Sequence, residues 1–166
     1  MPGKVDDRAG VLQALEDAVA DAAGYLATVD EDLHDGHQTA REVLCHLVFW
    51  HREYVQITRA MIDGRQPSLR RGTFARLNAE ATREFAGQKM TDLADSLLEL
   101  GETLLSQLRS LPDWSVPFPV KYGGRPKNVA ERLPSIARHL RGHMSRLQRA
   151  ARLGEAWVKA YYPDQE

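Results

Sequence analysis

The chain has little cysteine, no long apolar run and no apolar stretch near its first residue. Its single cysteine, Cys45, cannot form an intramolecular disulfide. No stretch approaches the roughly 18 consecutive apolar residues that a membrane-spanning helix requires. The first residues lack the apolar core that marks a secretory signal. We therefore expect a soluble, cytoplasmic protein that does not contact a membrane.

The charges of the chain are balanced. Lys and Arg number 22 and Asp and Glu 23, so the formal net charge is -1. Nucleic-acid binding usually needs an overall positive field, which this composition does not supply. A length of 166 residues suits one domain with its own core. We expect a single domain over residues 1–166 that acts on a small molecule and does not bind nucleic acid.

Strand-like alternation, internal repeats and low-complexity segments are all absent from the sequence. Apolar residues recur instead at helical spacing. They predict long helices over residues 8–29, from about 40 to the stop signal at Gly64, over 92–110, and from Asn128 or Pro134 to about 153. A shorter amphipathic segment over residues 74–85 predicts an accessory helix. The fold class is therefore all-α, a four-helix bundle with a short accessory helix.

Several residues predict how these helices begin. Asp6 or Asp7 can cap the first helix, and Thr39 with Glu42 forms a capping box for the second. Thr91 is the expected cap of the third long helix. Residues 112–127 form a proline-rich loop that we expect to pack its three aromatic side chains against the core: Trp114, Phe118 and Tyr122.

Two histidines stand one turn apart in the last helix. His139 and His143 share one side of it, because residues four apart are neighbours on a helix surface. That side also carries Ile136 and Leu147, so we expect both rings to point into the bundle. Two imidazole nitrogens can then face one ion.

A third histidine, His46, lies in the second turn of the second long helix. If successive long helices alternate in direction, the second and last run parallel, and His46 lies level with His139. Three imidazoles leave an open coordination position, as in catalytic zinc sites. The alternative is that these histidines flank the core and are held by hydrogen bonds. Spacing alone leaves both interpretations open.

Two segments resemble the DinB-like superfamily, which includes thiol-dependent S-transferases and mycothiol-dependent maleylpyruvate isomerases. They are T-A-R-E-V-L-C-H-L-V-F-W-H-R-E-Y over residues 39–54 and I-A-R-H-L-R-G-H-M-S-R-L over residues 136–147. The family's metal ligands are one histidine early in the second helix and an H-x-x-x-H pair in the last. The resemblance thus implies a divalent metal, zinc or nickel, on His46, His139 and His143, and a low-molecular-weight thiol as a second cofactor.

The segment T-F-A-R-L-N-A-E over residues 73–80 and the letters W-H-R-E after His46 are similar to the DfsB/ClbS subgroup. That subgroup includes cyclopropane hydrolases that protect against DNA-alkylating genotoxins, and not all of its members keep three histidines. The resemblance implies a metal-dependent enzyme of the S-transferase or hydrolase type, acting in detoxification or stress defence. The alternative is a non-catalytic protein that binds and sequesters a ligand.

Several residues near His46 in the sequence could have either a structural or a functional role. Trp50 either packs in the core or walls a substrate pocket, and Cys45 is an inert, small buried side chain. His51 could serve as a base or support a ligand histidine, but it falls one position off the apolar stripe, so we expect it to be partly exposed. Glu53 could likewise orient a ligand histidine or serve as a base, but we expect it to be exposed toward Arg52 or Arg59.

Other segments are further from the three histidines in sequence. His34 and His37 are expected to be solvated loop residues. Residues 121–125, K-Y-G-G-R, form either a lid over the site or an ordinary surface loop. An apolar cluster near the C-terminus is a hint of homodimerisation: Trp157, Val158, Tyr161 and Tyr162.

Overall fold

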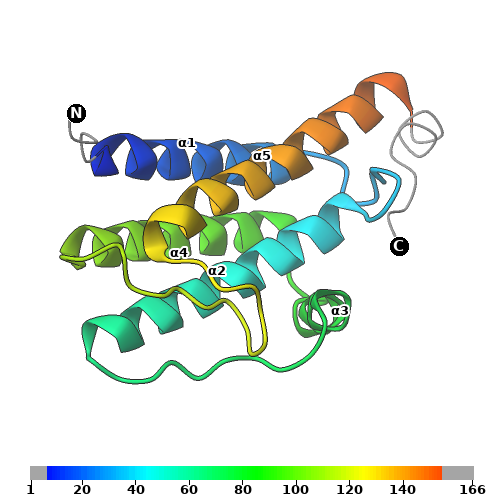
Figure 1. Cartoon of the computed structure of the whole chain (residues 1–166). Coiled ribbons are helices and arrows are strands. Elements are labelled where there is room, and N and C mark those ends of the chain that lie inside the picture. Colours follow the sequence, from blue (N-terminus) through cyan, green and yellow to red (C-terminus); the bar gives the residue numbers. More distant parts are fainter. Residues whose placement is uncertain (1–6, 155–166) are drawn as a thin grey trace.

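The computed structural model describes residues 7–154, which form five α-helices and no β-strand (Figure 1). The all-α prediction is confirmed. Four helices are long, and one is a short accessory helix. In chain order they are α1 (Arg8–Leu26), α2 (Ala40–Ile62), α3 (Phe74–Glu84), α4 (Met90–Ser110) and α5 (Val129–Leu153).

Most helix starts follow the predicted capping residues. The Asp7 side chain accepts a hydrogen bond from the Gly10 amide, and Thr39 and Glu42 form the predicted capping box. An equivalent box between Asn128 and Glu131 starts α5, so Pro134 lies inside that helix. The prediction for Thr91 is wrong. Helix α4 begins at Met90, two residues before the predicted start at residue 92, and its N-cap, Lys89, makes no side-chain hydrogen bond.

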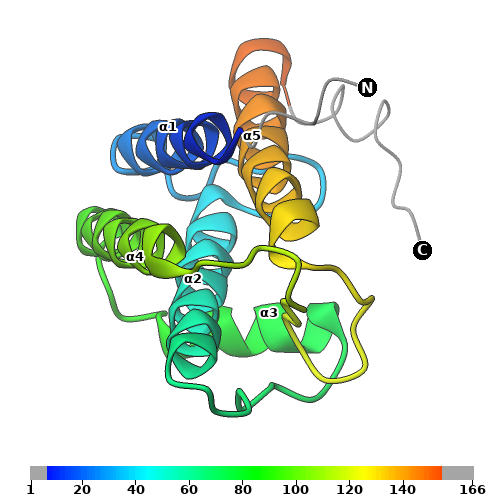
Figure 2. The same cartoon turned by 60° about the vertical axis from the view of Figure 1, so that its left-hand side comes forward.

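The long helices do not surround the core symmetrically. Helix α1 packs against α4 and α5, and α2 packs against α4 and carries α3 on its other side (Figure 2). Helices α2 and α5 approach each other closely over only a few residues. Long side chains from α2 and α5 can therefore meet in the space between these two helices.

The predicted parallel orientation of α2 and α5 is wrong, because the two helices run in opposite directions (Figure 1). Gln38, just before α2, lies 3.4 Å from Nδ1 of His143. Tyr54, two turns beyond His46, instead packs on Phe118, whose carbonyl oxygen is bonded by Arg132 near the start of α5. The cause is the segment 63–89, which carries the chain back along the bundle, so that α4 runs parallel to α2.

The loop between α4 and α5 is held by backbone hydrogen bonds. The amides of Phe118 and Val129 donate to the carbonyls of Lys127 and Val116. Trp114 and Phe118 are buried as predicted, but Tyr122 is 56% exposed, which corrects the prediction for that residue. The Tyr122 ring lies under the Arg71 guanidinium, 3.7 Å from it. This contact ties the loop to the segment before α3.

Among the described residues, no helix is both long and apolar enough to cross a membrane. The aromatic cluster near the C-terminus, with Trp157, Tyr161 and Tyr162, lies outside the described residues.

Gly101 sets the distance between α4 and α1. A Cβ atom there would lie 2.7 Å from Cγ1 of Val19, a β-branched side chain that cannot turn aside within its helix. We predict that Gly101→Ala lowers the free energy of unfolding by about 1–3 kcal/mol, measured by urea denaturation. The matched control is Gly24→Ala in α1, where a Cβ atom meets nothing within 4 Å. That substitution should raise stability by about 0.5–1 kcal/mol. Equal effects of the two would contradict the packing argument.

Candidate metal centre

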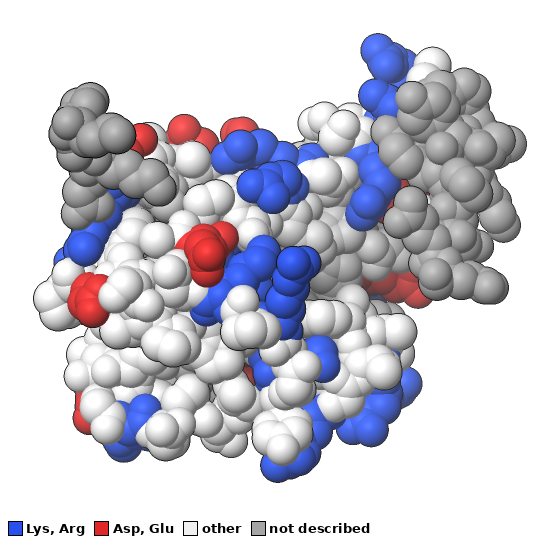
Figure 3. All heavy atoms as spheres, in the orientation of Figure 1, with Lys and Arg blue, Asp and Glu red and all other residues white. Residues whose placement is uncertain are grey.

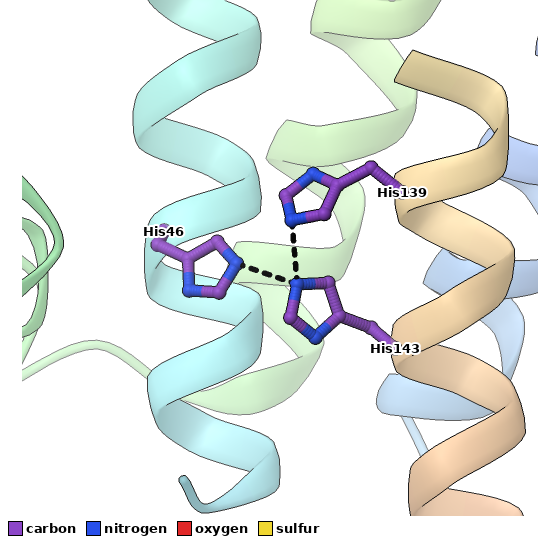
Figure 4. Close-up of side chains that lie close together, drawn as sticks. All are labelled: His46, His139 and His143. Atoms are coloured by element: carbon purple, nitrogen blue, oxygen red, sulfur yellow. Dashed lines mark hydrogen bonds between the residues drawn. The ribbon is translucent and has the colours of Figure 1, made fainter. Parts of the chain in front are cut away.

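Three histidines meet in the space between α2 and α5 (Figure 4). His46 projects from the second turn of α2, and His139 and His143 project from the middle of α5. Nε2 of His143 lies 3.1 Å from Nε2 of His46 and 2.8 Å from Nε2 of His139. One nitrogen from each ring lies within 4.8 Å of the other two. The structure thus brings together the three predicted residues, although α2 and α5 run antiparallel.

The arrangement of these nitrogens favours a bound cation. A neutral imidazole nitrogen carries either one proton or one lone pair. Nε2 of His143 can therefore make one good hydrogen bond along its ring plane, but it faces two other Nε2 atoms at hydrogen-bond distance. A divalent ion accepts the lone pairs of all three rings at once. The donor set therefore fits a metal.

The three rings differ in their exposure to solvent. His46 and His143 are buried, with 2% and 3% of their surfaces exposed. His139 is exposed, which corrects the prediction that both histidines of α5 point away from water. Its Nε2 atom nevertheless faces the other two rings (Figure 4). The site is therefore open to solvent on the side of His139.

Burial keeps these imidazoles neutral. Loss of hydration, followed by the nearby His139, Arg146 and His51, lowers the pKa of His46 to about 3. The pKa of His143 is also lowered, mainly by burial and then by His46 and His139. Burial likewise lowers the pKa of His139. Neutral rings at neutral pH are the form that binds a metal.

The far side of His143 contacts two hydrogen-bond donors. Nδ1 of His143 lies 3.0 Å from Nη2 of Arg146 and 3.4 Å from Nε2 of Gln38. Without a metal this ring accepts at Nδ1 and carries its proton on Nε2. Coordination through Nε2 would move that proton to Nδ1, where the Gln38 amide can turn its oxygen to accept it. Arg146 also lies 3.6 Å from the fully buried carboxylate of Asp35.

The loop before α2 therefore borders the site through Asp35 and Gln38. His34 and His37, which lie in the same loop, do not join the three histidines. His37 is exposed, as predicted. His34 is half-buried, and its Nδ1 atom accepts a hydrogen bond from the Gly36 amide.

The prediction that His51 is partly exposed is wrong, since only 1% of its surface is exposed. Its Nδ1–H donates to the Leu47 carbonyl, 2.8 Å away. Its Nε2 atom is buried and has no hydrogen-bond partner within residues 7–154. Burial lowers the pKa of His51 to about 4, so the ring is neutral. The nearly continuous apolar run over residues 43–50 was the signal for a helix buried all round.

The prediction for Glu53 is also wrong. Its side chain is 3% exposed and pairs with Arg70, with 3.1 Å between Oε1 and Nη2. The segment that carries Arg70 folds back on α2, which periodicity could not show. Trp50 is buried and donates from its indole nitrogen to Oδ1 of Asn78 in α3, at 2.7 Å. Cys45 is fully buried, as predicted, and burial raises the pKa of its thiol.

Comparison with known proteins agrees with this architecture. No curated protein and no solved structure gives a significant match to the chain. A family model described as the DinB superfamily matches residues 6–147, a range that includes all three histidines and most of the helical bundle. The chain therefore belongs to the DinB superfamily.

Proposed function

We propose that this protein is a metal-dependent enzyme that acts on a small molecule. The observation that carries the proposal is the convergence of Nε2 atoms from His46, His139 and His143 within 4.8 Å. Structural zinc sites are closed by four protein ligands, whereas catalytic sites use three and keep one position open. Three histidines, one of them exposed, fit the catalytic pattern.

Zinc and nickel both suit this donor set, because imidazole is a good ligand for either ion. Bound there, such an ion would lower the pKa of a water or thiol at the open position and supply a nucleophile at neutral pH. The protein's own residues hold the rings neutral and position them: burial keeps His46 and His143 neutral, and the Gln38 amide oxygen can accept from Nδ1–H of His143 when Nε2 holds the ion. The reaction class is transfer of a low-molecular-weight thiol, through its sulfur, to an electrophilic substrate, or else hydrolysis, in detoxification or stress defence.

The DfsB/ClbS subgroup is part of this proposal. The two segments that resemble it contact each other in space, because Trp50 bonds Asn78 across α2 and α3. Such a fixed pair can form one wall of a ligand pocket one turn from His46. A non-catalytic sequestration protein is the second candidate, supported by the hydrogen bonds that satisfy Nδ1 of His143 without a metal. Tight ligand binding without turnover by metal-loaded protein would favour this candidate.

The first test is the metal content of tag-free protein, measured by mass spectrometry. We predict near-stoichiometric metal in the wild type and a decrease of more than about tenfold in His46→Ala, His139→Ala and His143→Ala. His139→Ala is the most informative variant, because this exposed side chain contributes little to the core. Its helical circular dichroism should be unchanged. His37→Ala, with an exposed loop histidine, is the control that should retain metal. Wild-type metal content in His139→Ala would show that the three residues are not the ligands.

The lowered histidine pKa values also predict how stability depends on pH. Between about pH 6.5 and 3 the unfolded chain binds a proton at His46 that the folded chain does not. Stability of the metal-free protein is therefore lost as the pH falls through this window. From pH 7 to pH 5 the loss is about 2 kcal/mol for each such histidine. The free energy of unfolding, measured with urea at pH 7 and pH 5, should therefore fall by about 2 kcal/mol less in His46→Leu than in the wild type. If the free energy of unfolding depends on pH in the same way in both proteins, His46 is not buried in its neutral form.

A further inference from the structure

Beyond the three histidines, a second polar group lies between α2 and α5. It consists of His51 and Tyr54 on α2 and Arg132 on α5. The rings of His51 and Tyr54 are 5.3 Å apart, and the rings of Tyr54 and Phe118 are 6.0 Å apart. Nε of Arg132 donates to the Phe118 carbonyl at 3.1 Å. Phe118 thus links the two elements, because its ring packs on Tyr54 and its carbonyl oxygen accepts from Arg132.

Arg132 is a buried cation without a counterion. Only 9% of its surface is exposed. It donates to two backbone carbonyls, those of Phe118 and Arg125, and pairs with no carboxylate in the part of the chain that the structure describes. Burial lowers the pKa of its guanidinium, a sign that its charge is poorly compensated. Buried charges in proteins are normally paired, so a bound anion would compensate this one.

Tyr54 and His51 add one free donor and one free acceptor. The Tyr54 side chain is only 8% exposed, but its hydroxyl oxygen is not sealed from solvent and makes no hydrogen bond to any residue from 7 to 154. Burial raises the pKa of this hydroxyl to about 12, so it stays protonated and can donate. Nε2 of His51 carries a lone pair, because its Nδ1 holds the proton given to Leu47. Buried polar groups without partners are rare and call for an explanation.

The position of this set relates it to the candidate metal centre. Arg132 precedes His139 by two turns on the same side of α5, about 10 Å along the axis. Tyr54 follows His46 by just over two turns on α2, which runs the opposite way. Both helices therefore place this set on the same side of the three histidines, toward the start of α5. A small molecule about 10 Å long would reach from one to the other.

The surface nearby is also positive. Between Asp113 and Glu131 the chain carries no acidic residue, but it carries Lys121, Arg125 and Lys127. Lys and Arg side chains gather over the segment that leads into α5 (Figure 3). Such a field raises the local concentration of anions.

We propose that Arg132, Tyr54 and His51 form an anion-binding pocket beside the three histidines, and that the substrate is a small organic carboxylate with a neighbouring hydroxyl or N–H group. Arg132 and Tyr54 donate to the carboxylate, and Nε2 of His51 accepts from the hydroxyl or N–H. The reactive end of the molecule then lies at the histidines. This inference rests on the proposed function and specifies its substrate class.

The test uses benzoate as an anionic probe and benzamide as its uncharged counterpart, with binding measured by calorimetry on the full-length, metal-free protein. We expect benzoate to bind and benzamide to bind much more weakly. The variants are Arg132→Met and Tyr54→Phe, with Arg138→Met as the control on the exposed face of α5. Benzoate affinity should fall by about tenfold or more in Arg132→Met, as expected for loss of a charged hydrogen-bond partner. It should fall less in Tyr54→Phe and remain unchanged in Arg138→Met.

Tyr54→Phe keeps the hydrogen bonds from Arg132 to the loop. If Arg132→Met does not fold, Tyr54→Phe therefore still tests the anion pocket. The proposal is overturned if the wild type does not bind benzoate, or if its affinity is the same in Tyr54→Phe and Arg138→Met as in the wild type. Metal content, measured separately, keeps the two proposals apart. Benzoate binding that depends on Arg132 in a protein that takes up no metal would refute the metal enzyme and leave the anion pocket standing.

Discussion

The constraint on which this structure depends is the meeting of three imidazole nitrogens between two helices that otherwise stay apart. Two of the rings are buried and have lost most of their hydration, so their converging Nε2 atoms need a proton, a donor or an ion between them. Helices α2 and α5 approach each other closely over only a few residues, which leaves room for rings rather than for interlocking aliphatic side chains. The rest of the bundle packs conventionally through α1 and α4, and it can therefore hold this gap open.

The cations around the site favour neutral imidazoles and anionic ligands. Arg146 is a cation beside His143, and Arg132 lies two turns before His139 on the same helix. Arg146 helps to keep the imidazoles unprotonated, and the buried carboxylate of Asp35 lies 3.6 Å from it. A positive surrounding favours ligands in their deprotonated, anionic forms. A thiolate, a hydroxide or a carboxylate would each be stabilised there, which is consistent with both the proposed chemistry and the proposed anion pocket.

The sequence predicted the start of a helix correctly where that start depends only on neighbouring residues. The capping box of Thr39 and Glu42 and the cap at Asp7 depend only on residues within one turn, and the structure contains both. Thr91 failed because a helix can begin without a side-chain cap when its packing is strong enough, as α4 does at Met90. His51 and Glu53 were expected on the outside, because a single apolar stripe was assumed for a helix that is covered on nearly all sides. Glu53 is covered by Arg70, which lies 17 positions along the chain.

The sequence by itself determined the all-α class, the helix ranges and the pair on one face of the last helix, because helical periodicity and the spacing of four residues are properties of a single helix. It also carried the resemblance that joined His46 to that pair. Only the tertiary structure decided that α2 and α5 run antiparallel, since the direction of a helix depends on the path of the connection before it. The exposure of His139, the unpaired charge of Arg132 and the orphaned nitrogen of His51 were likewise decided by packing, because each depends on which distant segments cover a side chain.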